Sequence, residues 1–126
     1  MKLLNALVGE LARLKLGTPG KDLFHSFMPA QIKTGTLVLT RVAINVDRYT
    51  SQQKGPFQVI CRGPTPEAVH GKASEIAKAL KRERAVVGEV SFQFICPEHE
   101  PFVYPRTEGG QYEASVNYSF VASWEN

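Results

Sequence analysis

The sequence predicts one α+β domain with a mostly antiparallel sheet, in the order α-β-β-α-β-β, with the helices packed on one face of the sheet. Apolar residues recur at helical spacing in two segments, residues 3–16 and 65–82. In four other segments apolar and polar residues alternate, as in strands: 35–46, 57–61, 88–96 and 111–124. No repeat or linker-like tract divides the 126 residues, so we expect a single domain over residues 1–126.

The first half of the chain provides one predicted helix and two predicted strands. The helix runs from Leu3 to Leu16, and the turn-forming residues 17–20 stop it. Residues 22–29 form an aromatic lead-in that ends at a proline, which disfavours helix. From Gly35 the apolar period becomes two, and one face of this strand holds Val38, Val42, Ile44 and Val46. We expect it to form an antiparallel hairpin with a second strand, whose inner face holds Phe57, Val59 and Cys61.

The second helix has the clearest local signal. Thr65 suits the N-cap, Pro66 suits the first helical position, and Glu67 complements the positive end of the helix dipole. The stripe expected to face the sheet includes Ile76 and Leu80. The basic residues expected near the end of this helix are Lys78, Lys81, Arg82 and Arg84.

The last two predicted strands have the most regular alternation. One face of residues 88–96 holds Val90, Phe92, Phe94 and Cys96. One face of residues 111–124 holds only apolar and aromatic residues, at the even-numbered positions from Tyr112 to Trp124. We therefore expect a core that includes Phe92, Phe94, Val116, Tyr118, Ile76 and Leu80. The last strand would span about 46 Å, whereas a chain of this length is about 36 Å across. It must therefore bend at a bulge or project beyond its own domain, and a projecting strand with an aromatic face needs a partner.

Charge is distributed unevenly along the chain. Residues 89–126 contain six glutamates against Arg106 alone, a net charge of −5, which leaves +8 on residues 1–88. Such polarity can give acidic and basic faces that join copies head to tail. Nucleic-acid binding is the rival interpretation of the basic half, and the aromatic residues of the last strands could stack on bases. No RNP, GXXG or zinc-finger signature accompanies the charge.

The sequence predicts no catalytic site, no cofactor and no metal. Its three histidines, His25, His70 and His99, lie in three different segments, and the stretch from Cys96 to Glu100 lacks a second cluster of zinc ligands. Cys61 and Cys96 fall on predicted apolar faces and are expected to be reduced, inert thiols. The apolar runs are too short to span a bilayer.

The long polar loop Asp47–Gly55 is the candidate interaction site. It is longer than a simple hairpin connection needs, and long exposed loops often carry function. Tyrosine and arginine are also favoured at protein interfaces. The candidate interface residues are Arg48, Tyr49, Gln52, Gln53 and Lys54.

The pattern around the second helix resembles the tail terminator (tail-completion or minor capsid) proteins of long-tailed bacteriophages. In segment 57–63 a strand ends at Arg62, and a short turn and a helix beginning Thr65-Pro66-Glu67-Ala68 follow. Phe27-Met28-Pro29 before the first strand and residues 110–118 in the last strand agree with the same family. The resemblance covers most of residues 20–124.

This resemblance implies a structural virion protein and not an enzyme. It implies a ring, typically a hexamer, on the last ring of tail-tube protein, with its other face toward the head-completion or connector proteins of the neck. DNA would pass through the lumen without specific binding, and assembly would occur in the host cytoplasm. The 47–55 loop would then order against the tail tube. The alternatives are a small basic nucleic-acid-binding α+β module and another neck or tail component, such as a head-completion protein or a tube subunit.

Overall fold

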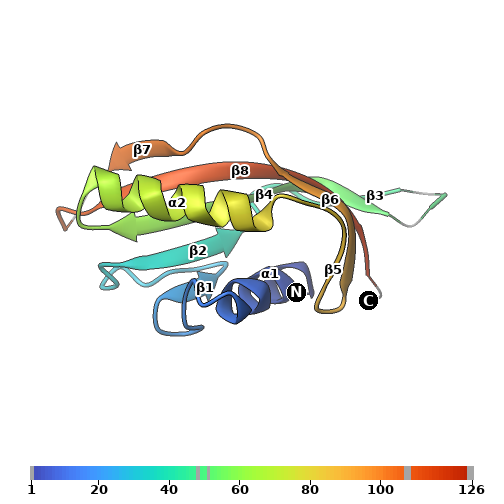
Figure 1. Cartoon of the computed structure of the whole chain (residues 1–126), viewed down its shortest axis with the longest axis horizontal. Helices are drawn as coiled ribbons and strands as arrows, with labels where there is room; N and C mark the ends of the chain where they lie inside the picture. The colour runs from blue at the N-terminus through green and yellow to red at the C-terminus, as the bar shows by residue number, and fades with distance from the viewer. Residues whose placement is uncertain (1, 48, 51, 107–108, 125–126) are drawn as a thin grey trace.

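The structure is a computed structural model that describes residues 2–47, 49–50, 52–106 and 109–124 (Figure 1). Its elements follow in the order α1 (Lys2–Arg13), β1 (Leu23–His25), β2 (Gly35–Leu39), β3 (Asn45–Val46), β4 (Gln53–Gly63), α2 (Pro66–Leu80), β5 (Arg82–Val87), β6 (Val90–Pro97), β7 (Phe102–Pro105) and β8 (Tyr112–Ser123). The strands form one sheet in the order β1-β2-β4-β8-β6-β5, with β3 beside β4 and β7 beside β8.

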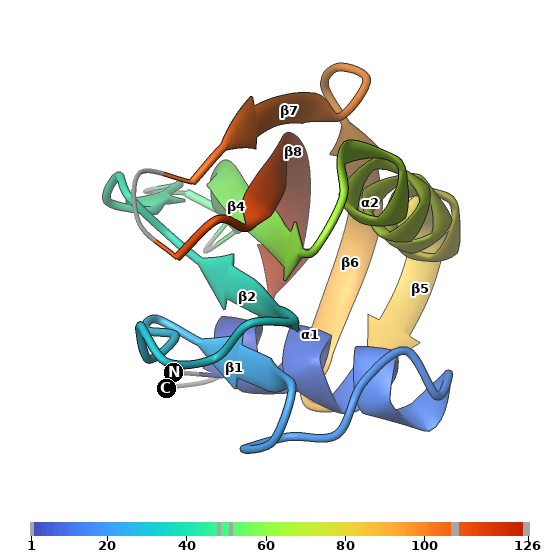
Figure 2. The ribbon, with the colours of Figure 1, turned by 90° about the vertical axis from the view of Figure 1, so that its left-hand side faces the viewer.

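The sheet is mostly antiparallel, as the sequence predicts. Only the pairing of β1 with β2 is parallel among the strand pairs of the described residues. Both helices and the inner faces of the strands contribute to a single apolar core, and Figure 2 shows these elements arranged around one interior. The predicted α+β fold is therefore confirmed.

Strands β4 and β8 form the centre of the sheet. Their antiparallel pairing runs from Gly63 opposite Tyr112 to Gln53 opposite Ala122. On its other side β8 changes neighbours along its length, because β7 pairs with residues 112–115 and β6 pairs with residues 118–123. In the core, the rings of Phe57 and Tyr118 stack with centroids 4.7 Å apart.

A β-bulge in β6 changes which of its side chains are buried. The register against β8 shifts between Phe92 and Phe94, which reverses the alternation beyond this point. Phe92 and Ile95 are therefore buried, whereas Phe94 is only half-buried. The prediction that Phe94 lies in the core was wrong, and Ile95 takes that place. Figure 1 shows β5, β6 and the end of β8 curving together at this end of the sheet.

Several short strands lie where the sequence predicts connections or other elements. The predicted strand over residues 35–46 is divided into β2 and β3, while β1 lies in the predicted lead-in and β7 in the predicted 97–110 loop. Strands of two to four residues are too short for an alternating pattern to stand out, and they form because the edge of a longer strand pairs with them.

Helix α2 begins as predicted and ends earlier. The Thr65 side chain accepts a hydrogen bond from the Ala68 N–H at 3.1 Å, which makes it the N-cap, and Pro66 is the first helical residue. The helix ends at Leu80 because Lys81 has an extended backbone. Arg82 and Arg84 therefore belong to β5, not to the basic end of the helix, and Arg82 Nε donates to the Ala79 carbonyl at 3.0 Å.

A buried carboxylate joins α1 to the start of β5. Glu10 is 8% exposed, accepts hydrogen bonds from Nε and Nη2 of Arg13 at 2.7 Å, and also forms an ion pair with Arg82. The hydrogen bonds from Arg13 and Arg82 outweigh the effect of burial and lower the pKa of Glu10 from 4.5 to about 2. The ionised form of Glu10 is therefore part of the folded structure.

We expect replacement of Glu10 by glutamine to lower the free energy of unfolding at pH 7 by on the order of 2 kcal/mol. The folded pKa lies below the unfolded one, so the contribution is complete above the unfolded value of 4.5 and is lost as the pH falls toward 2. Urea unfolding of wild type and variant at several pH values between 7 and 2 measures this difference in stability and its loss at low pH. Glu75→Gln, on the exposed face of α2, is the matched control. Equal stability of Glu10→Gln and wild type at pH 7 would contradict the role of this carboxylate.

The Tyr118 hydroxyl provides a second test of the core. It is buried without a hydrogen-bond partner among the described residues, and burial raises its pKa above the usual range. Because an unpaired buried hydroxyl costs free energy, Tyr118→Phe should leave stability unchanged or raise it by about 1 kcal/mol. Tyr118→Ala, which also removes the ring stacked on Phe57, should cost about 3–5 kcal/mol. Thermal or urea unfolding of both variants measures these changes in stability. A clear loss of stability in Tyr118→Phe would show that the hydroxyl is hydrogen-bonded in the folded protein.

Candidate functional site

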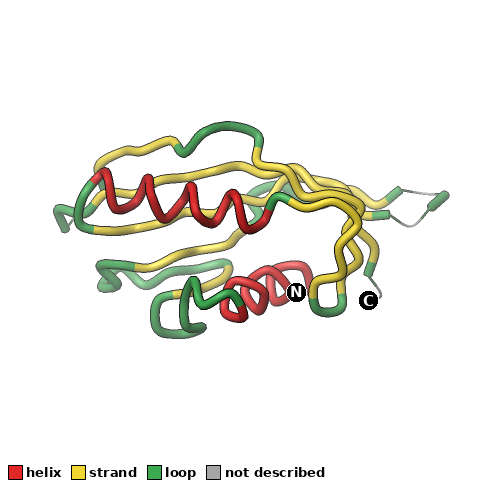
Figure 3. The backbone as a smooth tube through the Cα atoms, in the orientation of Figure 1, coloured by secondary structure: helices red, strands yellow, loops and turns green. Residues whose placement is uncertain are grey.

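The predicted interaction loop is the end of a projecting hairpin. Asn45 pairs with Lys54 and Val46 with Gln53, so β3 and the start of β4 form the stem. The Asp47 N–H donates to the Gln52 carbonyl at 2.7 Å and closes the turn. The connection therefore covers residues 47–52, shorter than the predicted Asp47–Gly55, because β4 begins at Gln53. Figures 1 and 3 show this hairpin extending beyond the rest of the domain at one end of its long axis.

The side chain of Asp47 organises the turn. Its Oδ1 accepts hydrogen bonds from the backbone N–H of Tyr49 at 2.8 Å and of Thr50 at 3.0 Å, which is the pattern of an Asx-turn. The N–H groups of Thr50 and Tyr49 lower the pKa of Asp47, so the turn is held by an ionised carboxylate. The side chain of Tyr49 is 88% exposed and that of Val46 is 64% exposed. The hairpin thus displays two apolar groups on a structured support.

The five predicted interface residues do not share one environment. Tyr49 and Lys54 are exposed and Gln52 is half-buried. Gln53 is only 5% exposed and lies opposite Ala122 of β8, so its prediction as an exposed loop residue was wrong. Arg48 lies outside the described residues. The alternating pattern over 35–46 placed Val46 on the same face as Val38, whereas in the structure Val38 is buried and Val46 is exposed in the stem of the hairpin.

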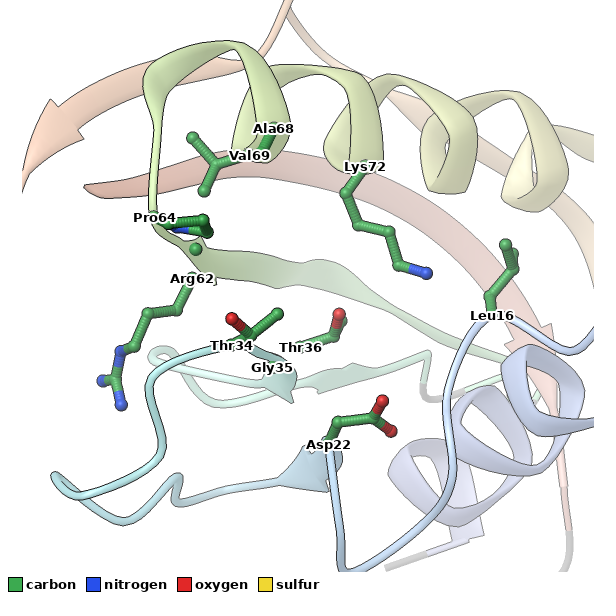
Figure 4. Close-up of a pocket in the computed structure, with 11 residues that line it drawn as sticks. Leu16, Asp22, Thr34, Gly35, Thr36, Arg62, Pro64, Ala68, Val69 and Lys72 are labelled. Carbon is green, nitrogen blue, oxygen red and sulfur yellow. The ribbon is translucent and has the colours of Figure 1, made fainter. Parts of the chain in front are cut away.

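A pocket of about 210 Å³ lies between the start of α2, the end of β4 and β2 (Figure 4). Figure 1 shows the start of α2 and the end of β4 at the opposite end of the long axis from the hairpin. Its walls include the apolar side chains of Leu16 and Val69. Figure 4 shows Asp22 and Lys72 directed into the space from opposite sides. Asp22 Oδ1 accepts a hydrogen bond from the Thr18 N–H at 2.6 Å. No histidine or cysteine is among the described residues that line this pocket.

Arg62, the last residue but one of β4, has a structural role. Its Nε pairs with Glu113 of β8 at 2.9 Å, and its Nη1 donates to the carbonyls of Pro29 at 3.0 Å and Ile32 at 2.9 Å. Figure 4 shows the guanidinium group pointing away from the pocket. A second arginine, Arg106, donates to the Ala30 carbonyl at 2.9 Å. Two arginines therefore fix the segment that leads into β2.

Neither cysteine forms a disulfide, and the two thiols differ in burial. Burial raises the pKa of the Cys61 thiol to about 12, which keeps it protonated and unreactive. Cys96, predicted to be buried, is half-buried. In the described part of the chain, no three histidine, cysteine, aspartate or glutamate side chains gather where they could hold a metal ion.

The charge polarity of the sequence is partly lost in three dimensions. Arg62 from the basic part pairs with Glu113 from the acidic part, and Lys78 and Lys81 line the same groove as Glu100. The base-stacking alternative also loses support, because two of its aromatic residues, Phe92 and Tyr118, are buried in the core. No helix in the described ranges is long and apolar enough to cross a membrane.

Comparison with known proteins identifies the family. The sequence matches the bacteriophage tail terminator protein family over residues 10–124. No curated protein matches the sequence. A chain in the structure of the virion of a native gene transfer agent particle has a similar fold, with a TM-score of 0.70 and 12% sequence identity, over 95% of this chain and 93% of that one. The chain therefore belongs to the bacteriophage tail terminator family, and it is a structural component of the phage tail and virion that contacts other virion proteins.

Proposed function

We propose that this chain forms a ring, a hexamer, at the head-proximal end of the tail tube, where it stops tube polymerisation and provides the docking surface for the neck. Membership of the tail terminator family supports this role. The structural observation that carries it is the projecting β3–β4 hairpin, which offers exposed apolar groups that the domain itself does not cover.

The mechanism is steric and needs no bond-making step. A ring seated on the last tube ring covers the edge to which the next tube subunit would bind. Its opposite face then presents a different surface to the head-completion or connector proteins. DNA passes through the lumen without specific binding, and the protein acts by binding, not by catalysis.

The hairpin is proposed as the contact with the tail tube. Asp47 holds the turn before any partner binds, so less conformational freedom is lost on association. Tyr49 supplies apolar area at the tip and Val46 supplies it in the stem, and tyrosine is among the residues that most often anchor interfaces. Lys54 adds an exposed positive charge at the base of the hairpin, and Gln52 and Arg48 complete the proposed contact. Gln53 supports the stem from within the sheet.

The oligomeric state tests the ring. Purified full-length protein, or protein mixed with its tail-tube subunit, should give a native mass six times the 14.0 kDa of the chain. Its retention on DNA-cellulose should be weak and should not fall steeply with salt. A monomer whose DNA affinity falls steeply with salt, as expected when several phosphate charges are neutralised, would contradict the ring and support a nucleic-acid-binding module.

Shortening the hairpin tests the tube contact. Replacement of residues 48–51 by Gly-Ser keeps Asp47 and Gln52 as the hydrogen-bonded pair that closes the turn, because Gly-Ser suits a two-residue type II′ turn. The variant should fold by circular dichroism, melt within a few degrees of wild type and form the ring, yet allow overlong tails that do not join heads. Tyr49→Ser should have a weaker effect of the same kind.

Phe102→Ser is the matched control, because Phe102 is 63% exposed and lies on β7, away from the hairpin. Electron microscopy of tail lengths and the yield of infectious particles measure the outcome. Tails of normal length that join heads would show that the hairpin is only a connection. Loss of the ring itself would assign the hairpin to contacts between copies of this chain.

A further inference from the structure

The point where β8 changes neighbours is closed by a histidine. β7 pairs with β8 up to Ser115 and β6 pairs from Tyr118, so among the described residues no strand pairs with Val116 and Asn117 on that side. The loop between β6 and β7 fills this gap. The Glu98 N–H donates to the Asn117 carbonyl at 2.8 Å, and the Asn117 N–H donates to Nε2 of His99 at 3.1 Å.

These contacts specify the protonation of the imidazole. Nδ1 of His99 lies 2.6 Å from the Glu100 carbonyl oxygen. A carbonyl can only accept, so Nδ1 carries the hydrogen, whereas Nε2 faces an N–H donor and must carry none. Only the neutral ring with its hydrogen on Nδ1 satisfies both contacts. A second proton on Nε2 would place two N–H groups against each other.

Charged groups of both signs surround His99. Lys78 of α2 and Lys81, which follows the helix, line the same groove and disfavour a positive charge on the imidazole. In the loop itself, the carboxylates of Glu98 and Glu100 favour a positive charge on the imidazole. Arg41 is linked to Asn117 through Gln58, since Arg41 Nε donates to Gln58 Oε1 at 2.7 Å and Gln58 Nε2 donates to Asn117 Oδ1 at 3.0 Å.

We propose that His99 is a proton-controlled latch that holds the 98–101 loop on β8 when neutral and releases it when protonated. Imidazole is the side chain that ordinarily changes charge between about pH 5 and pH 8. The loop lines two grooves, one beside α2 and one beside Arg41 and Asn117. Protonation of His99 therefore changes the shape of both grooves, and with it the surface that the protein presents to a partner.

Amide exchange at Asn117 tests the latch in the full-length protein. Protection is expressed relative to an unstructured peptide at the same pH, at about pH 7.5 and about pH 5. We expect protection of the Asn117 amide to fall about three- to tenfold at the lower pH, the effect of one lost hydrogen bond. The Val59 amide of β4 should keep its protection, which separates local opening from unfolding.

Two variants make the test specific. His99→Gln retains a neutral acceptor, so its Asn117 amide should be equally protected at both pH values. His99→Phe has no hydrogen-bond acceptor in the side chain, so its Asn117 amide should be weakly protected at both pH values. If it does not fold, the comparison of wild type with His99→Gln still decides. Equal pH dependence in these two proteins, or a wild-type ring with its hydrogen on Nε2 at pH 7.5 by nitrogen NMR, would overturn the proposal.

Discussion

The pairing of β4 with β8 is the interaction on which the rest of the structure depends. These strands of eleven and twelve residues lie side by side along almost their whole length, and every other part of the sheet attaches to one of them, directly or through a neighbouring strand. Their inner faces supply Phe57 and Tyr118, which stack at the centre of the core against which α2 packs. Strand β4 also connects the two ends of the domain, because it begins in the projecting hairpin and ends at Gly63 beside the pocket.

The sequence was informative where a structural preference is local and repeated. The apolar stripe and the Thr65-Pro66 start of α2 depend on neighbours within a few residues, and both were predicted correctly. The bulge in β6 depends instead on how that strand meets β8, so strict alternation placed Phe94 in the core in error. The bond of Arg62 to Glu113 likewise follows only from the register of two strands far apart in sequence.

The same distinction applies to the candidate site. The polar composition of residues 47–55 correctly indicated an exposed turn, and Tyr49 lies at its tip. The turn itself is made by the Asp47 carboxylate, which the sequence could have suggested through the preference of aspartate for such positions. The burial of Gln53 could not be predicted, because it follows from pairing with Ala122, which lies much later in the chain.

The continuity of the hairpin with β4 has a mechanical consequence. A pull on the tip along the long axis passes through the stem directly into β4, whose neighbour β8 runs antiparallel beside it over the full length of β4. The load therefore acts as shear, parallel to the strands, and the hydrogen bonds of the ladder share it. A pull across the strands would instead open them one after another. The domain is thus best able to resist tension in the direction in which its hairpin projects.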